Sequence, residues 1–274
     1  MIKKIVESLF DRLGVLSLAT YIYQVYLKRP PLAPFKELTR YYNYQSQEKI
    51  PIPSMYLRWL VINQIDPMLF LESGRLQAEQ LIKPLLEKHH APINTLGSIL
   101  DFGCGCGRII RYWHDCTNTE IWGCDYNPRL VKWCQKNIGF AQFKVNELQP
   151  PLPFEQGKFE FVYARSVFTH LTEKQQIPWL EEVHRVLQPR GLFLITVSGA
   201  YRRESLSTEE QQLFDAGKMV LRNSKMAGRN TCTAYHPQSY VMEILARSDF
   251  NVLEFVPGGT VQSAWQDTYL ARRN

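Results

Sequence analysis

The stretch SILDFGCGCGRII, residues 98–110, decides the fold of this 274-residue chain. It opens with a short apolar run typical of a buried strand and continues into three alternate glycines, Gly103, Gly105 and Gly107. A strand that enters such a turn and then a helix brings the backbone close to a ligand. The helix N-terminus adds free N–H groups and partial positive charge. We therefore expect a ligand site at the end of this strand, with the helix starting in RIIRYWHD, residues 108–115.

The chain beyond this stretch alternates apolar strand patterns with amphipathic helix patterns. Helix 127–138 is expected to begin at an Asn127 cap followed by Pro128, and helix 171–187 at a capping box of Thr172 and Gln175. Alternation of this kind predicts an α/β fold, a doubly wound, mostly parallel sheet with helices on both faces. The expected strands are residues 98–102, 120–125, 141–145, 159–164, 191–199, 250–256 and 267–273, and a last helix is expected at 237–248.

Glycine spacing separates the ligands that such a loop can hold. A P-loop needs Gly-Lys followed by Ser or Thr, which this stretch lacks, and a dinucleotide loop needs a third glycine where Arg108 stands. The pattern is instead D-x-G-x-G-x-G, with Asp101 before the first glycine. A second acid, Asp125, lies 125 − 103 = 22 residues beyond Gly103, near the ~20 expected of a ribose-binding acid.

These motifs together resemble the class I S-adenosylmethionine-dependent methyltransferases of the small-molecule type. The likeness covers about residues 70–274 and is carried by DFGCGCGR, IWGCDYNPRL, KVNELQPPLPFEQGKFEFVYARSVFTHLTE, VHRVLQPRGLFLITVSG and QDTYLARR. Arg190 departs from the family's usual L-x-P-G-G turn. The resemblance implies a Rossmann-like sheet of seven strands, the last antiparallel, and S-adenosylmethionine as cofactor.

The resemblance also implies roles for individual side chains. Asp125 would bind the ribose hydroxyls, Asn146 and Glu147 would lie at the adenine edge, and Asp101 would face the methionine ammonium. Arg108 is either a partner of the methionine carboxylate or a solvated helix residue. The expected cofactor-binding residues are Asp101, Phe102, Gly103, Cys104, Gly105, Gly107, Arg108, Asp125, Tyr126, Asn146, Glu147 and Ser166.

His170, in SVFTHL beside the expected methyl position, is the candidate catalytic residue. A histidine suits a general base near neutral pH, but it could equally hold the backbone around the cofactor. Tyr235 and His236 are weaker candidates. No metal is expected, because Cys104 and Cys106 complete neither a zinc pattern nor an iron–sulfur triplet.

Three functions remain open from the sequence. We expect a methyltransferase acting on a small molecule, such as a sugar or lipid-linked saccharide, with oxygen as the expected target atom and nitrogen or carbon as open alternatives. A nicotinamide-dependent oxidoreductase on a similar sheet and a non-catalytic cofactor-binding scaffold are the alternatives. The acceptor is expected to contact the arm around residues 30–70 or the polar insertion 201–236, which is either a lid or a surface loop. Its basic residues are Arg202, Arg203, Arg222, Lys225 and Arg229.

The chain is expected to divide into an N-terminal helix and Pro/Tyr-rich arm, residues 1–70, and a methyltransferase domain, residues 71–274. A net charge of +6 from 32 basic and 26 acidic residues is too weak to indicate nucleic acid. The apolar run Leu13–Leu27 is short for a membrane span, so residues 1–29 are either an interfacial helix on a membrane or a helix packed on protein. Six cysteines without a signal peptide favour reduced thiols in the cytoplasm.

Overall fold

A computed structural model describes residues 49–228, 232–260 and 265–274. The chain divides into two compact units, residues 1–73 and 74–274. The described part of the first unit contains α4 (Met55–Ile62) and most of α5 (Pro67–Arg75). Trp59 packs against Ile65, and the buried Arg58 Nε donates to the Ile65 carbonyl at 2.9 Å. The Pro- and Tyr-rich composition of residues 30–67 predicts a loosely structured arm, which is wrong for residues 55–62, because their apolar side chains pack against the following turn.

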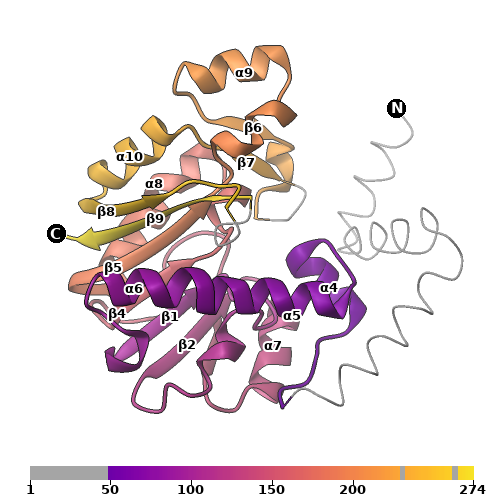
Figure 1. Ribbon diagram of the computed structural model, residues 1–274, viewed down its shortest axis with the longest axis vertical. Coiled ribbons are helices and arrows are strands. Elements are labelled where there is room, and N and C mark those ends of the chain that lie inside the picture. Colours follow the sequence, from indigo (N-terminus) through magenta and orange to yellow (C-terminus); the bar gives the residue numbers. More distant parts are fainter. Residues whose placement is uncertain (1–48, 229–231, 261–264) are drawn as a thin grey trace, which may run out of the picture. The chain divides into compact units, whose positions relative to one another are not determined.

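The second unit is built on a seven-stranded sheet in the order β3-β2-β1-β4-β5-β9-β8 (Figure 1). The strands β1 to β5 pair in parallel, and β9 runs antiparallel to both β5 and β8. This confirms the predicted doubly wound α/β sheet with an antiparallel last strand. The strands are β1 (Ser98–Phe102), β2 (Glu120–Asp125), β3 (Gln142–Val145), β4 (Phe159–Ala164), β5 (Leu187–Val197), β8 (Phe250–Val256) and β9 (Asp267–Arg273).

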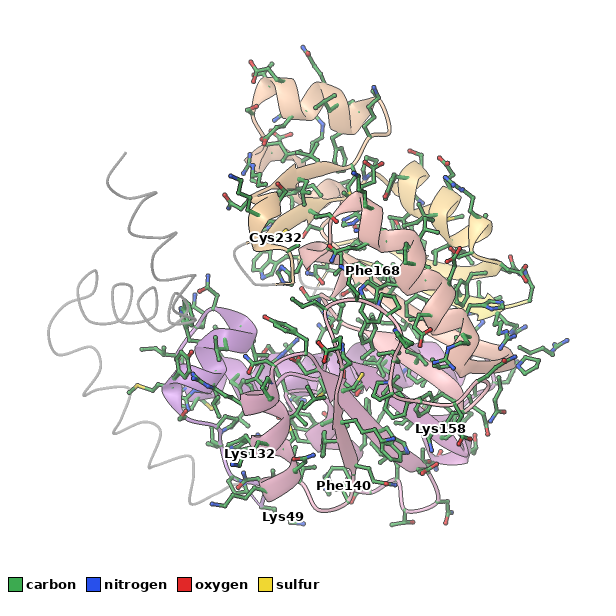
Figure 2. The ribbon with its side chains drawn as sticks, turned by 180° about the vertical axis from the view of Figure 1, so that it is seen from behind. Lys49, Lys132, Phe140, Lys158, Phe168 and Cys232 are labelled. Atoms are coloured by element: carbon green, nitrogen blue, oxygen red, sulfur yellow. The ribbon has the colours of Figure 1, made fainter. Side chains whose placement is uncertain are left out.

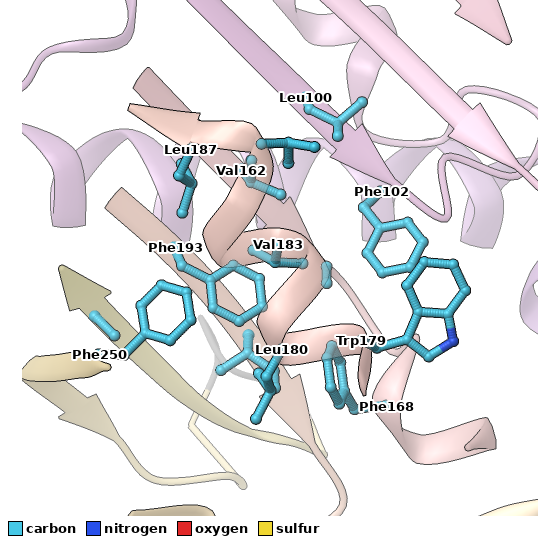
Figure 3. Close-up of a cluster of buried hydrophobic side chains, with 14 of the residues drawn as sticks. Leu100, Phe102, Val162, Phe168, Trp179, Leu180, Val183, Leu187, Phe193 and Phe250 are labelled. Carbon is cyan, nitrogen blue, oxygen red and sulfur yellow. The ribbon is translucent and has the colours of Figure 1, made fainter. Parts of the chain in front are cut away.

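One face of the sheet is covered by α8 (Glu173–Val186) and α10 (Gln238–Arg247), whose buried side chains join those of the strands in one apolar cluster. Figure 3 shows Phe102 at the end of β1 beside Trp179 of α8, with ring centroids 4.9 Å apart. Phe193 of β5 and Phe250 of β8 extend the cluster, with ring centroids 5.4 Å apart. This packing holds the carboxyl ends of the central strands in fixed positions, which is what a site at that edge needs.

The predicted helix caps are confirmed. Asn127 Oδ1 accepts from the Arg129 N–H at 3.1 Å at the start of α7 (Pro128–Asn137), and α7 packs against β2 and β3. The capping box of Thr172 and Gln175 starts α8. Arg190, where the family turn has glycine, has φ +63°, the left-handed conformation that glycine adopts at less cost.

The helix expected after the glycine loop is absent. Residues 110–113 form only the short 3-10 turn η4 (Ile110–Trp113). The residues between Gly107 and β2 bury Ile110 and Trp113 and return the chain to the start of β2 through turns. The argument from a helix N-terminus therefore does not apply to this loop, and its ligand contacts must come from backbone and side chains.

The apolar stripe of Leu76, Gln77, Gln80, Leu81 and Leu85 predicts a helix with a kink at Pro84, and residues 76–88 are helical with a change of register. A π-helical segment, η2 (Leu76–Ile82), runs into α6 (Lys83–Lys88), and the Lys83 N–H donates to the Ala78 carbonyl five residues back. Pro84 lacks an N–H, so a widened turn before it leaves fewer carbonyls without a donor. Gln77 and Leu81 are buried as predicted, whereas Gln80 is exposed.

The insertion at residues 201–236 is a folded cap. After η6 (Ala200–Ser205) it contains α9 (Thr208–Asp215), β6 (Val220–Arg222), η7 (Ser224–Met226) and β7 (Thr233–Tyr235), with β6 and β7 paired antiparallel (Figure 1). A small apolar cluster of Leu206, Phe214, Val220 and Tyr235 holds these elements together. Shorter 3-10 turns elsewhere are η3 (Ile93–Thr95) and η5 (Phe168–His170).

Candidate active site

The glycine loop starts at the carboxyl end of β1. Gly103, Gly105 and Gly107 have φ of +79°, +57° and +75°, a region in which a side chain would be strained. The Gly103 N–H donates to the Cys124 carbonyl at 2.8 Å, which ties the loop to β2. A Cβ on Gly103 would overlap the Val167 side chain, so the loop lies directly against the segment that follows β4.

The cysteines of this region brace the loop. The thiols of Cys104 and of Cys134 from α7 both donate to the Gly105 carbonyl, at 3.6 and 3.4 Å. Burial raises the pKa of the Cys106 thiol, so it stays protonated. Among the described residues no three His, Cys, Asp or Glu side chains are grouped as metal ligands.

Asp125 ends β2 with its carboxylate beside the loop. Oδ2 accepts from the Gly105 N–H at 3.0 Å and Oδ1 from the Asn127 N–H at 2.8 Å. Burial raises the pKa of Asp125 to about 6, against the lowering effect of these two hydrogen bonds. The carboxylate is thus held in one orientation and keeps further lone pairs for a hydroxyl donor.

Asp101 lies one strand away, on β1, and is 3% exposed. Burial raises its pKa to about 7, while a hydrogen bond from Tyr163 and the nearby Arg108 lower it. Tyr163 in turn accepts from the Trp113 indole N–H at 2.8 Å. The Asp101 carboxylate is therefore a destabilised anion in a rigid setting, which a ligand cation would stabilise.

Asn146 follows β3 and is buried beside Asp125, whose carbonyl accepts from the Asn146 N–H at 3.2 Å. Its side-chain Nδ2 donates to the Glu147 carbonyl at 2.7 Å, whereas its buried Oδ1 has no partner among the described residues. An amide oxygen in this condition fits the amino group of a purine. Glu147 itself is exposed, and Tyr126 is half-buried.

The segment after β4 begins with Arg165 and Ser166. Ser166 has φ +66°, and its N–H donates to Thr196 Oγ1 at 2.8 Å. Its Oγ accepts from Gln266 Nε2 at 2.6 Å and also lies 3.1 Å from Thr169 Oγ1. The strained backbone is thus held by β5 and by the residue that precedes β9.

His170 lies at the end of η5, where the insertion reaches the sheet. Its Nδ1 is 2.7 Å from the Cys232 carbonyl, so Nδ1 carries the proton and Nε2 is the basic nitrogen. Burial lowers its pKa below 6.5, which keeps the imidazole neutral at pH 7. Figure 2 shows Cys232 near Phe168, the first residue of η5. The Gly228 N–H donates to the His170 carbonyl at 2.7 Å, so the insertion holds this histidine on two sides.

The predicted residues meet in one place, with two qualifications. Asp101, the glycine loop, Asp125 and Asn146 lie at the ends of β1, β2 and β3, the carboxyl edge where ligands bind in such sheets. The Phe102 side chain instead packs in the core against Trp179, so only its backbone faces the loop. Of the weaker candidates, His236 is fully buried against Gln176 at 3.0 Å, and burial lowers its pKa to about 3.

Sequence reasoning missed Arg165, Thr196 and Gln266. The Arg165 guanidinium donates to Gln77 Oε1 at 2.6 Å, to Thr196 Oγ1 at 3.1 Å and to Gln266. The signal for Arg165 is its position as the first residue after a predicted strand, at the edge of the sheet where ligands bind. Gln266 directly precedes β9 and reaches the site because β9 lies between β5 and β8. The local sequence pattern does not predict this strand order.

Two of the five basic residues predicted to hold the acceptor from the insertion form ion pairs within it. Arg203 pairs with Asp215 at 2.5 Å, and Arg222 pairs with Glu210. Arg202 and Lys225 are exposed, and Arg229 lies outside the described residues. These ion pairs link η6 and β6 to α9 within the insertion.

Known proteins similar to this chain agree with this geometry. The family model described as "Methyltransferase domain" matches residues 99–191, the segment from β1 into β5. An uncharacterized methyltransferase of Synechocystis is 30% identical over 112 residues, 39% of this chain and 52% of that protein. The phosphoethanolamine N-methyltransferase of Plasmodium falciparum is 23% identical over 155 residues, 56% of each chain. The chain thus spans about half the length of these curated relatives.

Solved structures share the fold. An S-adenosylmethionine-dependent methyltransferase of Mesorhizobium loti superposes with a TM-score of 0.55 at 16% identity, covering 69% of this chain and 96% of that one. One from Methanosarcina mazei gives 0.53 at 19% identity, covering 68% and 96%. The oxidoreductase alternative gains no support from these matches. Residues 99–191 therefore match a methyltransferase domain, and the fold of the second unit is that of S-adenosylmethionine-dependent methyltransferases.

Proposed function

We propose that this protein transfers a methyl group from S-adenosylmethionine to a small-molecule acceptor. The observation that carries the proposal is the buried carboxylate of Asp101, which directly precedes the glycine loop, together with Asp125 bonded to that loop. S-adenosylmethionine carries a sulfonium and an ammonium against a single carboxylate, so an acid at the position of Asp101 suits it better than it suits a pyrophosphate. Asp125 fits a ribose in either kind of cofactor.

The residues present fit each part of the cofactor. Asp125 keeps lone pairs for the ribose hydroxyls, and the buried Asn146 Oδ1 without a partner suits the adenine amino group. Asp101, with its pKa raised by burial, suits the ammonium. Arg108, half-buried and close enough to Asp101 to lower that pKa, is proposed to bind the methionine carboxylate. Gly103, Gly105 and Gly107 allow the backbone to approach closely.

When bound, the cofactor supplies a methyl group already activated by the sulfonium. The protein then has to position the acceptor, exclude water and remove a proton where the acceptor carries one. We assign proton removal to His170 Nε2, since Nδ1 donates to the Cys232 carbonyl and the ring is neutral at pH 7. A neutral base of this kind favours a hydroxyl acceptor, which supports O-methylation, of a sugar or a lipid-linked saccharide in our proposal.

The folded insertion supports water exclusion. Gly228 donates to the His170 carbonyl, and a Cβ on Gly228 would overlap Leu148, two residues beyond Asn146. The same loop thus touches both the proposed base and the proposed adenine loop. We infer that the insertion is a lid over the reacting groups.

Methyl transfer is tested with labelled S-adenosylmethionine and a metabolite extract. We expect label in a small molecule with the wild type and at least a hundredfold less with His170→Ala, at unchanged affinity for S-adenosylhomocysteine. Tight cofactor binding with no labelled acceptor would instead support a non-catalytic scaffold. Binding of NADH but not of S-adenosylhomocysteine in calorimetry would contradict the proposal itself.

Location in the cytoplasm, with membrane contact through residues 1–29, remains a proposal. Residues 1–29 lie outside the described part of the chain, and no helix among the described residues is long and apolar enough to cross a membrane. Flotation of the full chain with anionic liposomes, compared with a chain starting at Pro31, tests the contact. Equal flotation of the two would contradict it.

A further inference from the structure

Arg165 is a cation held by neutral groups at the centre of the carboxyl edge. It is the first residue after β4 and is half-buried. Its Nε donates to Gln77, and its Nη1 donates to Thr196 and Gln266. A planar guanidinium clamped along these two sides has a fixed orientation.

No carboxylate neutralises this charge within the described residues. The acceptors around Arg165 are amide and hydroxyl oxygens, and its nearest charged neighbour is a second cation, Arg108. Burial, reinforced by Arg108, lowers the pKa of Arg165 to about 9. The internal segments outside the description, residues 229–231 and 261–264, read RNT and VQSA and contain no acid.

One end of the guanidinium is not used by the protein. In the part of the chain that the structure describes, Nη2 has no hydrogen-bond acceptor. Nη2 is also not sealed from solvent. Nη2 therefore offers two N–H donors, and a guanidinium binds carboxylate and phosphate oxygens more strongly than neutral ones.

Two of the three contacts of Arg165 extend away from the proposed cofactor groups. In the strand order β3-β2-β1-β4-β5-β9-β8, Asp125 and Asn146 belong to one half of the sheet. Thr196 on β5 and Gln266 before β9 belong to the other half. Arg165 also adjoins Ser166, which Gln266 contacts at 2.6 Å. Nη1 is thus fixed toward the half of the edge that the cofactor groups leave to the acceptor, while Nε is held by Gln77.

We propose that Arg165 binds an anionic group, a carboxylate or a phosphate, of the methyl acceptor, and that the acceptor is therefore an anionic small molecule. This inference rests on the proposed function and narrows its substrate class. The charges support it: Arg108 and Arg165 balance the carboxylates of Asp101 and Asp125, and S-adenosylmethionine then adds a net positive charge. An anionic acceptor restores the balance, whereas a neutral one would leave like charges facing each other in a partly buried site.

The test measures stabilisation of the intact protein by inorganic phosphate and, separately, by acetate. Tm is recorded against each anion at constant ionic strength, with and without saturating S-adenosylhomocysteine. Arg165→Gln removes the charge, Arg165→Lys keeps it without the planar fork, and Arg247→Gln, an exposed arginine in α10, is the matched control. Circular dichroism of each variant checks that it is folded.

We expect one or both anions to raise the Tm of the wild type and of Arg247→Gln. In Arg165→Gln the apparent anion affinity should fall about tenfold or more, with an intermediate fall in Arg165→Lys. The arm that responds identifies phosphate or carboxylate as the preferred group. Affinity for S-adenosylhomocysteine should change by less than about threefold, because Arg165 is not assigned to the cofactor.

Two results would overturn the inference. One is anion stabilisation that is absent, or equal in the wild type and Arg165→Gln. The other is a loss of S-adenosylhomocysteine affinity in Arg165→Gln matching the loss of anion affinity, which would place the cofactor carboxylate on Arg165. Failure of the wild type to bind S-adenosylhomocysteine would overturn the proposed function instead, and the anion series without it still tests the site.

Discussion

The buried carboxylate of Asp101 should make the cofactor-free protein less stable as pH rises. Burial raises the pKa of Asp101 from 3.8 to about 7, so the folded state holds a proton that the unfolded state releases between these values. A shift of about three units at 1.36 kcal/mol each corresponds to about 4 kcal/mol of stability, present below pH 4 and lost as pH rises through 7. Asp101→Asn removes this ionisation and keeps an oxygen to accept the Tyr163 hydrogen bond.

The expected outcome is a difference in unfolding free energy between variant and wild type that grows with pH. From pH 5 to pH 8 it should increase by about 2 to 3 kcal/mol in favour of Asp101→Asn, since most of the titration falls in this range. Urea unfolding followed by fluorescence, without cofactor, measures it. Asp115→Asn is the matched control, because the Asp115 side chain is 87% exposed.

The wild type should bind S-adenosylhomocysteine more tightly than Asp101→Asn, the reverse of their order in stability without cofactor. The ammonium of S-adenosylhomocysteine favours the charged carboxylate, so wild-type affinity should rise with pH up to about 7, and Asp101→Asn should bind more weakly at every pH. A stability difference that does not change between pH 5 and pH 8 would refute the reasoning. It would mean that Asp101 is already ionised at pH 5 and that burial does not raise its pKa.

Three further outcomes follow from the same geometry. Asp125→Asn should weaken S-adenosylhomocysteine binding by about 10- to 100-fold in calorimetry, because the ribose loses a charged acceptor, and an unchanged affinity would contradict the assignment. With wild-type protein, kcat/KM should fall as pH drops through the lowered pKa of His170, since protonation removes the base, and the same profile in wild type and His170→Ala would contradict that role. Gly107→Ala, at φ +75° with its Cβ overlapping Ile138, should lower the unfolding free energy by about 2 kcal/mol or more in urea. Gly139→Ala, where a Cβ meets nothing within 4 Å, is the control and should change little.

The sheet could be predicted because parallel strands are buried on both faces and therefore form continuous apolar runs. β1, with burial at all five positions, and β4 are such runs, and their predicted ends agree with the structure. The missed elements have weaker local patterns. α9 is short and mostly polar, and β6 and β7 have three residues each, so they are fixed by the cluster around Phe214 and Val220 rather than by their own periodicity.

The site divides in the same way. Asp101 and Asp125 each follow an apolar run directly. Because the carboxyl ends of parallel strands meet at one edge of the sheet, and the two acids are spaced as in a nucleotide-binding βαβ unit, the sequence suffices to place them in one site. Arg165 also follows a strand, but its meaning depends on what surrounds it. Only the structure reveals that its partners Gln77, Thr196 and Gln266 are all neutral and come from distant parts of the chain.

The strand order places the carboxylates of Asp101 and Asp125 and the guanidinium of Arg165 at different parts of the carboxyl edge. Carboxylates end β1 and β2, a guanidinium follows β4, and their positions in the sheet cannot be exchanged without exchanging the strands. In the proposed assignment, the cationic cofactor binds in the half of the edge that holds β1 and β2, and the anionic acceptor in the half that holds β4 and β5. Opposite charges then select the two ligands, so each is disfavoured in the other's place. A protein that carried Asp at position 165 would lose this distinction, since both halves would then attract the cofactor.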